Sequence, residues 1–176
     1  MQLAAEALGA VAVIFNFIGY RQNDINRYRF ISALALAFVS AHFFMIDAMA
    51  AGIGCMLAAI RNIVAMRYRH VGILYLFVGL NVAFLLIELF ILKNGIMILV
   101  AYASSLIFTV GTIVLQDANL IRRWFILAEV LGLIYALFVG SIFGSVFNIS
   151  NLFSIGLKLW QERRVASTDH IHQDKR

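Results

Sequence analysis

The chain of 176 residues contains no proline, a single cysteine and few charged side chains. The single cysteine, Cys55, excludes an internal disulfide and any metal site built from paired cysteines. Without proline, the most common cause of a helix kink is missing, and the twelve glycines are weaker points of bending. Charged residues make up 13% of the chain, about half of the roughly 25% found in soluble domains. This shortage argues against a soluble enzyme.

Apolar residues are abundant instead, at 63% of the chain against roughly 45–50% in a soluble domain. So much apolar surface excludes disorder, and a soluble domain of this size could not bury it. A transmembrane helix needs about 20 apolar residues, and polar or turn-forming clusters interrupt the chain at six places. The breaks at 47–52 and 140–145 carry almost no charge, so six spans is the main alternative to seven. The seven predicted spans cover about residues 4–20, 30–47, 52–67, 72–92, 96–115, 124–140 and 144–160.

Basic residues gather at alternate breaks between these spans. Twelve of the fourteen lysines and arginines fall on one side of the predicted layout, only Lys93 falls on the other, and Arg61 lies within a span. Cytoplasmic loops carry the excess of Lys and Arg, so we expect the N-terminus outside and a polar tail, residues 163–176, in the cytoplasm. The net charge of +5 is therefore explained by topology. The expected partner is the lipid bilayer, not nucleic acid.

One polar pattern occurs twice, after the first predicted span and after the fifth. An offset of 93 residues superposes the two copies, and polar matches are informative because polar residues are scarce here. The alternative is chance together with a shared need for polar caps at cytoplasmic helix ends. The matched residues of this repeat motif are Asp24, Asn26 and Arg29 in the first copy and Asp117, Asn119 and Arg122 in the second.

The offset predicts two three-helix units, about residues 4–67 and 96–160, joined by a linker helix at about 72–92. A single linker span restores the chain direction, so the two units run parallel, as in some transporters. The predicted fold is therefore all-α: a polytopic membrane protein with seven transmembrane helices in a 3+1+3 parallel repeat of three-helix bundles. It forms a single transmembrane domain over residues 1–162.

Four stretches resemble the YgjV family of bacterial inner-membrane proteins. They are HFFMIDAMAAG at 42–52, AAIRNIVAMRYR at 58–69, GSIFG at 140–144 and KLWQERR at 158–164. The resemblance implies a bacterial inner-membrane location and brings no catalytic residues with it. The 3+1+3 plan also resembles the SWEET, PQ-loop and PnuC-like transporters, which is an analogy of architecture. SWEET-type proteins carry prolines in each three-helix unit, and this chain departs from that pattern.

Arg61 is the most costly polar residue inside a predicted span, since a central arginine costs about 2.5–3.5 kcal/mol on insertion scales. Its candidate carboxylate partners are Glu129 and Glu88. Alternatively, the long side chain reaches the cytoplasmic interface about 9 Å away. His42 is a candidate proton relay near Asp47, with an interhelical hydrogen bond as the alternative. Arg61, Glu129 and His42 are the predicted gating or ion-pair residues.

Amide side chains at membrane depth are candidates for solute contact, because an amide both donates and accepts hydrogen bonds. Alternatively, such amides hold helices together, at about 0.6 kcal/mol each. The predicted substrate-binding residues are Asn16, Asn62, Asn148, Asn151 and Tyr135.

The sequence contains no zinc-protease motif, no phosphate-binding loop motif and no mid-span lysine of the kind that binds retinal. We therefore expect no enzyme activity, no cofactor and no metal site. The prediction is a small-solute transporter or facilitator with a midplane site for an unknown solute. The alternative is a non-transporting structural or adaptor protein of the membrane. A homodimer is compatible with so small a core, although no residue pattern requires one.

Overall fold

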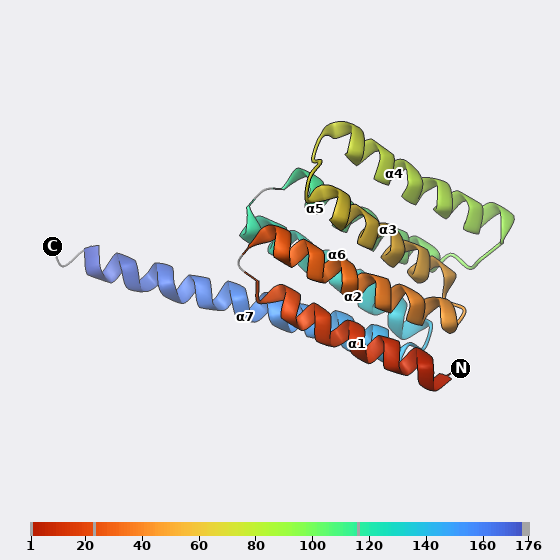
Figure 1. Cartoon of the computed structure of the whole chain (residues 1–176), viewed down its shortest axis with the longest axis horizontal. Helices are drawn as coiled ribbons and strands as arrows, with labels where there is room; N and C mark the ends of the chain where they lie inside the picture. Colours follow the sequence, from red (N-terminus) through yellow and green to blue (C-terminus); the bar gives the residue numbers. More distant parts are fainter. Residues whose placement is uncertain (1, 23, 116, 174–176) are drawn as a thin grey trace.

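The computed structural model describes residues 2–22, 24–115 and 117–173, with side chains for these residues except Gln2, Ala118, Asn119 and 162–173. Throughout this part of the chain the secondary structure is helical, and the prediction of an all-α protein with seven helices is confirmed (Figure 1). A π-helical turn, η1 (Ile87–Ile91), prolongs the fourth helix. The helices are α1 (Gln2–Tyr20), α2 (Ile25–Met45), α3 (Met49–Ala65), α4 (Val71–Leu86), α5 (Ile98–Val114), α6 (Ala118–Phe138) and α7 (Ile142–Gln173).

Four of these helical segments are long and apolar enough to cross a membrane: α1, α2, α4 with η1, and α7 as far as Gln161. α3 and α5 are shorter apolar helices of 17 residues, close to the lower limit for a span. α6 has 21 residues but carries three charges, Arg122, Arg123 and Glu129. The helix does not end where the predicted tail begins, at residue 163, because α7 continues to Gln173.

Aspartates fix where α2 and α6 begin. The Asp24 carboxylate accepts a hydrogen bond from the Arg27 amide at 2.7 Å, and Asp117 accepts one from the Leu120 amide at 2.8 Å. Each aspartate satisfies a donor that the first helical turn leaves free. The capped helices therefore begin at Ile25 and Ala118, a few residues before the predicted membrane spans, which start at about 30 and 124.

The turns that end α2 and α6 have the same hydrogen-bond pattern. Asp47 and Gly140 both adopt left-handed backbone, with φ of 59° and 71°. In the first turn the Ala48 amide donates to the Phe43 carbonyl at 2.9 Å. In the second, Ser141 donates to Ala136 at the same distance. Both turns are Schellman motifs, which bond the last free carbonyls of a helix. They lie 93 residues apart, and α3 and α7 begin 93 residues apart as well.

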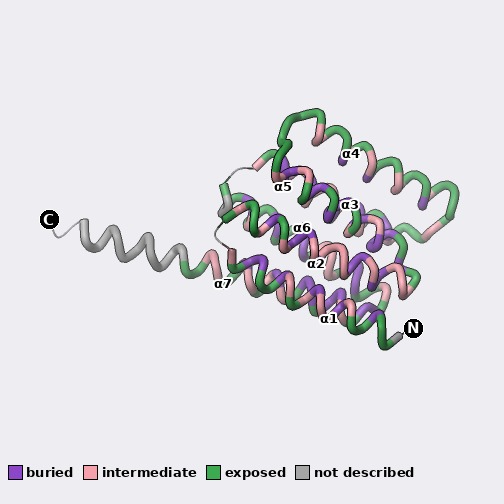
Figure 2. The backbone as a smooth tube through the Cα atoms, viewed as in Figure 1, coloured by how far each residue is buried: buried purple, intermediate pink, exposed green. Residues whose placement is uncertain are grey.

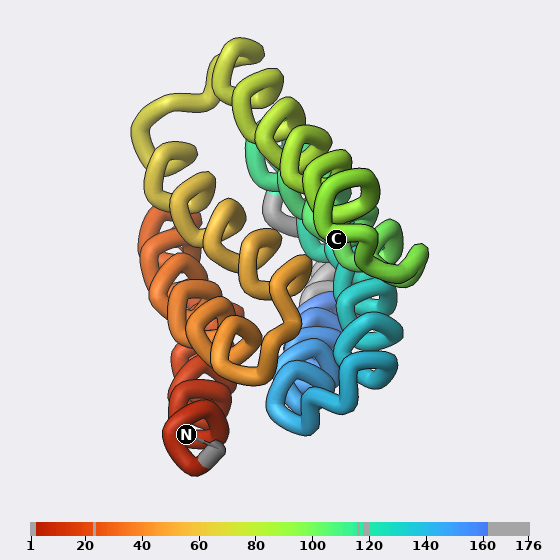
Figure 3. Tube along the Cα trace, turned by 90° about the vertical axis from the view of Figure 1, so that its right-hand side faces the viewer, coloured from red at the N-terminus to blue at the C-terminus, as the bar shows by residue number. Residues whose placement is uncertain are grey.

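Six helices form a closed ring. Contacts run from α1 to α2, α2 to α3, α3 to α5, α5 to α6, α6 to α7 and back to α1. Figure 3 shows α1–α3 on one side of the ring and α5–α7 on the other. α4 lies outside the ring, mainly against α5, and most of its surface is exposed (Figure 2). The turns α1–α2, α3–α4 and α5–α6 lie at the same end as the extension of α7 (Figure 1).

Candidate functional site

A cavity of about 100 Å³ lies within the ring, and its walls come from α1, α2, α3, α5, α6 and α7. A volume of this size holds several water molecules, whereas pockets for drug-sized ligands measure roughly 300–1,000 Å³. Arg61 and Glu129 both line the cavity. All five predicted substrate-binding residues line it too: Asn16, Asn62, Asn148, Asn151 and Tyr135.

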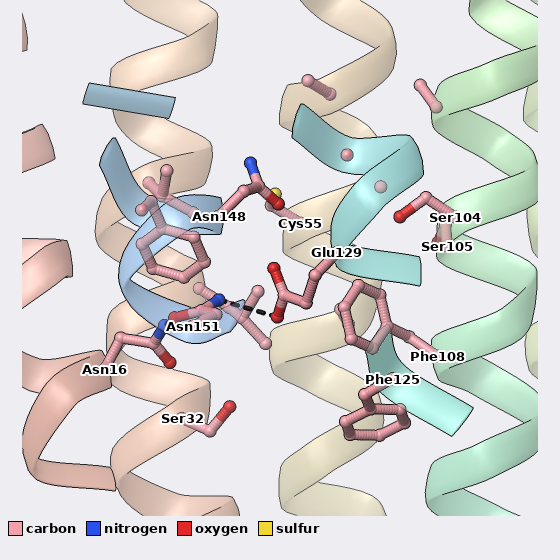
Figure 4. Close-up of a pocket in the computed structure, with 18 of the residues that line it drawn as sticks. Asn16, Ser32, Cys55, Ser104, Ser105, Phe108, Phe125, Glu129, Asn148 and Asn151 are labelled. Atoms are coloured by element: carbon pink, nitrogen blue, oxygen red, sulfur yellow. Dashed lines mark hydrogen bonds between the residues drawn. The ribbon is translucent and has the colours of Figure 1, made fainter. Parts of the chain in front are cut away.

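Glu129 lies at the centre of the first polar cluster in the wall. Its side chain is 2% exposed, and its Oε1 accepts hydrogen bonds from Tyr20 Oη at 3.0 Å and Asn151 Nδ2 at 2.7 Å. Asn151 in turn accepts a hydrogen bond from Asn16. Figure 4 shows the bond between Asn151 and Glu129 at the edge of the cavity. This cluster joins α1, α6 and α7, and among the described residues Glu129 Oε2 has no partner.

Arg61 lies at the centre of the second polar cluster. Its Nη1 donates to Thr109 Oγ1 at 2.9 Å and its Nη2 to Asn62 Oδ1 at 3.2 Å. Asn62 Nδ2 donates to Ser32 Oγ at 3.2 Å, so this cluster joins α2, α3 and α5. Within the described part of the chain, Arg61 Nε has no partner. Arg61 is only 2% exposed, so its side chain lies inside the bundle and does not reach the interface.

The structure brings Arg61 and Glu129 to the same cavity, but their hydrogen bonds go to other side chains. An ion pair between the two is not formed in the described structure, because each group is held by the polar side chains of its own cluster. Glu88 is not the partner of Arg61 either. It is fully buried between α4 and α5, where it accepts hydrogen bonds from Tyr102 Oη at 2.6 Å and Asn94 Nδ2 at 3.0 Å.

His42 is separate from the cavity wall. Its Nδ1 lies 2.8 Å from the Ala5 carbonyl, so this nitrogen carries the proton and donates. Its Nε2 lies 2.9 Å from Ser141 Oγ and, in the neutral ring, accepts from that hydroxyl. His42 therefore connects α2 to α1 and to the α6–α7 turn. These are the interhelical hydrogen bonds expected as the alternative to a proton relay. The other imidazole contacts are aromatic, with Phe43 and Phe143.

The repeat-motif residues also lie outside the cavity lining. Asp24 and Asp117 cap helices, and Asn26 is exposed. Arg29 is buried, and its Nη2 donates to the Thr112 carbonyl in the last turn of α5 at 3.2 Å. A cation is favoured at that end of a helix dipole. Arg122 is half-buried, while the side chain of Asn119 lies outside the described residues.

Sequence reasoning missed several hydroxyl groups of the wall, among them Tyr20, Ser32 and Ser104, and also Thr109, which lies outside the lining and bonds to Arg61. Serine and threonine are common in apolar helices, so they gave no individual signal. The offset of 93 residues could have pointed to Thr109, because it places Thr109 at the position equivalent to Asn16. Within the described chain, no group of three or more histidine, cysteine, aspartate and glutamate side chains is placed to hold a metal ion.

Comparison with known proteins gives one result. No curated protein and no solved structure matches the chain. A family model described as a bacterial inner membrane protein, Imp-YgjV, matches residues 3–165, which include all six helices of the ring as far as the cavity extends. The chain therefore belongs to the Imp-YgjV family of bacterial inner membrane proteins, as the sequence motifs predicted.

Proposed function

We propose that this inner-membrane protein is a small-solute transporter or facilitator and that the cavity inside the ring is its solute site. The observation that supports the proposal most is the convergence of polar side chains from six helices on one cavity inside the ring. Amides that only held helices together would be expected in separate helix interfaces. Here four amides share a cavity with a cation and a carboxyl group. Ionisable residues inside a membrane usually mark a functional site.

The arrangement of the two halves supports this proposal. Under the offset of 93 residues, α1 corresponds to α5 and α3 to α7, so the α1–α7 contact corresponds to the contact between α5 and α3. The equivalent caps and Schellman turns support an internal repeat of two parallel three-helix units. In transporters built from repeats, the solute site lies near the midplane between the repeats, and here the cavity lies between the two units.

Contacts at the two ends of the ring are suited to gating. His42 links α1, α2 and the α6–α7 turn at the end near the N-terminus. Arg29 links α2 to the end of α5 at the opposite, basic end. Rocking of one unit against the other would have to break these contacts in turn. By the positive-inside rule the basic end is cytoplasmic, which leaves the N-terminus outside and all seven helices in the membrane.

The experiment that tests the proposal combines a ligand screen with uptake. The protein purified in detergent is screened by thermal shift against sugars, nucleosides, vitamins and amino acids, and each hit is tested for uptake into proteoliposomes. A ligand at 100 times its Kd stabilises the protein by about 2.7 kcal/mol. Asn151→Ala is expected to abolish both the shift and the uptake.

The matched control is Asn81→Ala. Asn81 is a buried amide on α4, outside the cavity lining, and its Nδ2 donates to the Phe77 carbonyl of its own helix at 2.7 Å. This variant is expected to keep ligand binding and uptake. An equal loss in both variants, or no shift and no uptake across the whole panel, would contradict the proposal. That result would favour the second function, a structural or adaptor protein.

The second function is favoured by one observation. Most polar side chains of the wall bond to one another, and the bonds Asn16–Asn151 and Arg61–Thr109 each cross between the two halves. Such bonds also stabilise a bundle that transports nothing. The Asn81 control separates the two functions, because a purely structural role predicts loss of stability without any ligand effect.

A further inference from the structure

The cavity wall carries two opposite charges. Among the described residues that line it, Arg61 is the only cation and Glu129 the only carboxylic acid. The first comes from α3 and the second from α6, so each half of the ring supplies one. Both side chains are 2% exposed, and neither neutralises the other through an ion pair in the described structure. The cavity is therefore balanced in formal charge but separated into a cationic and an acidic side.

Each charged group has one polar atom left unbonded. These atoms are Arg61 Nε, a donor, and Glu129 Oε2, an acceptor. A buried polar atom without a partner is costly, and the large majority of such atoms in proteins are bonded. Ser105 Oγ, in the same wall, is also without a partner among the described residues. Each charged residue of the wall therefore has incomplete hydrogen bonding within the described structure, a free donor on Arg61 and a free acceptor on Glu129.

The two charges restrict which solutes fit. An anion would match Arg61 but face the Glu129 carboxyl group, and a cation would have the opposite difficulty. A neutral polar solute would bond to both groups with charge on the protein side only, so it would lack the attraction between opposite charges that a zwitterion gains on each side. The volume adds a size limit. An apolar cavity of about 150 Å³ holds benzene, so by proportion about 100 Å³ fits a solute of roughly four non-hydrogen atoms.

We infer that the cavity takes a small zwitterion with one carboxylate and one ammonium group, as in the smallest amino acids. The solute carboxylate pairs with the Arg61 guanidinium, and the solute ammonium pairs with the Glu129 carboxylate. Asn151 and Asn16 hold the carboxyl group of Glu129 in place from α7 and α1. Thr109 and Asn62 hold the guanidinium in the same way from α5 and α3. The inference rests on the proposed function and adds a substrate class to it.

The test uses four small probes on the purified full-length protein: glycine, acetate, methylamine and glycolamide. They are, in order, a zwitterion, an anion, a cation and a neutral polar molecule. Binding is measured by calorimetry and by thermal shift. Glycine is expected to bind about 10- to 100-fold more tightly than the other three, because each of them lacks at least one pairing of opposite charges with the wall.

Two variants should change the charge preference in opposite directions. Glu129→Gln removes the acidic side, so glycine binding falls and acetate becomes the better ligand. Arg61→Gln removes the cationic side, so methylamine becomes the better ligand. The matched controls are Glu88→Gln and Arg29→Gln, a buried acid and a buried arginine outside the cavity lining. Both controls should keep the preference for glycine. If Arg61→Gln does not fold, Arg61→Lys keeps the charge and should keep the preference.

Two outcomes would overturn the inference. One is that glycolamide binds as tightly as glycine with no effect of Glu129→Gln. The other is that none of the four probes binds while a different solute from the wider screen binds and depends on Asn151. In both cases the zwitterion class is wrong and the transporter proposal stands. The transporter proposal itself fails when the wider screen and the uptake assay are negative as well, or when Asn151→Ala and Asn81→Ala lose binding and uptake equally.

Discussion

The segments α1–α3 and α5–α7 share one cap, at α2 and α6, and one turn, after α2 and α6, and they differ at positions in or beside the cavity wall. Glu129 on α6 corresponds to Leu36 on α2, and Asn16 on α1 corresponds to Thr109 on α5. The cap and the turn are therefore of the same type in both segments, while the cation and the acid of the cavity wall occur once each. A cavity between two identical halves would have two arginines and two acids. The difference gives the wall one cationic side and one acidic side.

The largest expected effect comes from replacing Glu129 by the leucine found at the equivalent position, Leu36. Glu129→Leu copies Leu36 and leaves two buried donors, Tyr20 Oη and Asn151 Nδ2, without their acceptor. The expected loss of stability is about 2–4 kcal/mol, measured by denaturant unfolding in detergent. Leu36→Met is the control at the equivalent position, with an expected loss below about 1.5 kcal/mol. Equal losses at the two positions would contradict the importance assigned to Glu129.

A smaller effect is expected from closing the space beside Asn148. A Cβ added at Gly132 on α6 would lie 2.5 Å from Asn148 Oδ1, so the amide has to move into the cavity. Gly132→Ala should cost about 1–3 kcal/mol by overpacking. Gly156→Ala on α7 is the control, since no atom lies within 4 Å of the added Cβ, and there we expect a gain of about 0.5–1 kcal/mol. Thermal unfolding of the two variants should shift in opposite directions.

The two Schellman turns allow a sharper comparison, because one has glycine and the other aspartate at the left-handed residue. Gly140→Ala should cost about 1–2 kcal/mol, the price of left-handed backbone for an L-residue. Asp47→Gly removes such a cost and should stabilise by less than about 1 kcal/mol, since aspartate tolerates this conformation and glycine frees the unfolded chain. Urea unfolding of both variants is the measurement. The same sign in both would show that the two turns are not equivalent.

The smallest effects are expected at the helix caps. Asp24→Ala and Asp117→Ala each remove a hydrogen bond to the first turn of a helix, at 2.7 and 2.8 Å. Each should cost about 1 kcal/mol in thermal unfolding, and Asn at either position should restore most of it. A cost at only one of the two aspartates would argue against equivalent caps.

Much of this fold was predictable from the sequence. Long apolar runs separated by polar breaks predicted seven helices, and the scarcity of polar residues made the offset of 93 visible. The helix starts were the least predictable feature, because the helices extend beyond the predicted spans. Arg27 and Arg29 were assigned to a loop because charge marked the break, yet the cap at Asp24 places both within α2. Charge alone cannot separate a loop from a capped helix end.

The site was predictable only in part. The amides Asn16, Asn62, Asn148 and Asn151 were chosen for their depth, and the cavity gathers all four. The direct partners of Arg61 were not foreseen, because serine and threonine are frequent in apolar helices and pairing depends on helix rotation. The sequence favoured an opposite charge for Arg61, whereas the structure supplies the hydroxyl of Thr109 and the amide of Asn62.

The position of α4 outside the ring has a consequence for how the protein tolerates mutation. Most side chains of this helix, such as Tyr75 and Phe90, are exposed and contribute nothing to the cavity wall. A comprehensive mutational scan should therefore accept almost any apolar residue along α4 and η1. The exceptions are the buried positions Phe77, Asn81 and Glu88. Most residues of α4 therefore need only to be apolar. In the other six helices, packing against neighbouring side chains also restricts which residue is accepted at each position.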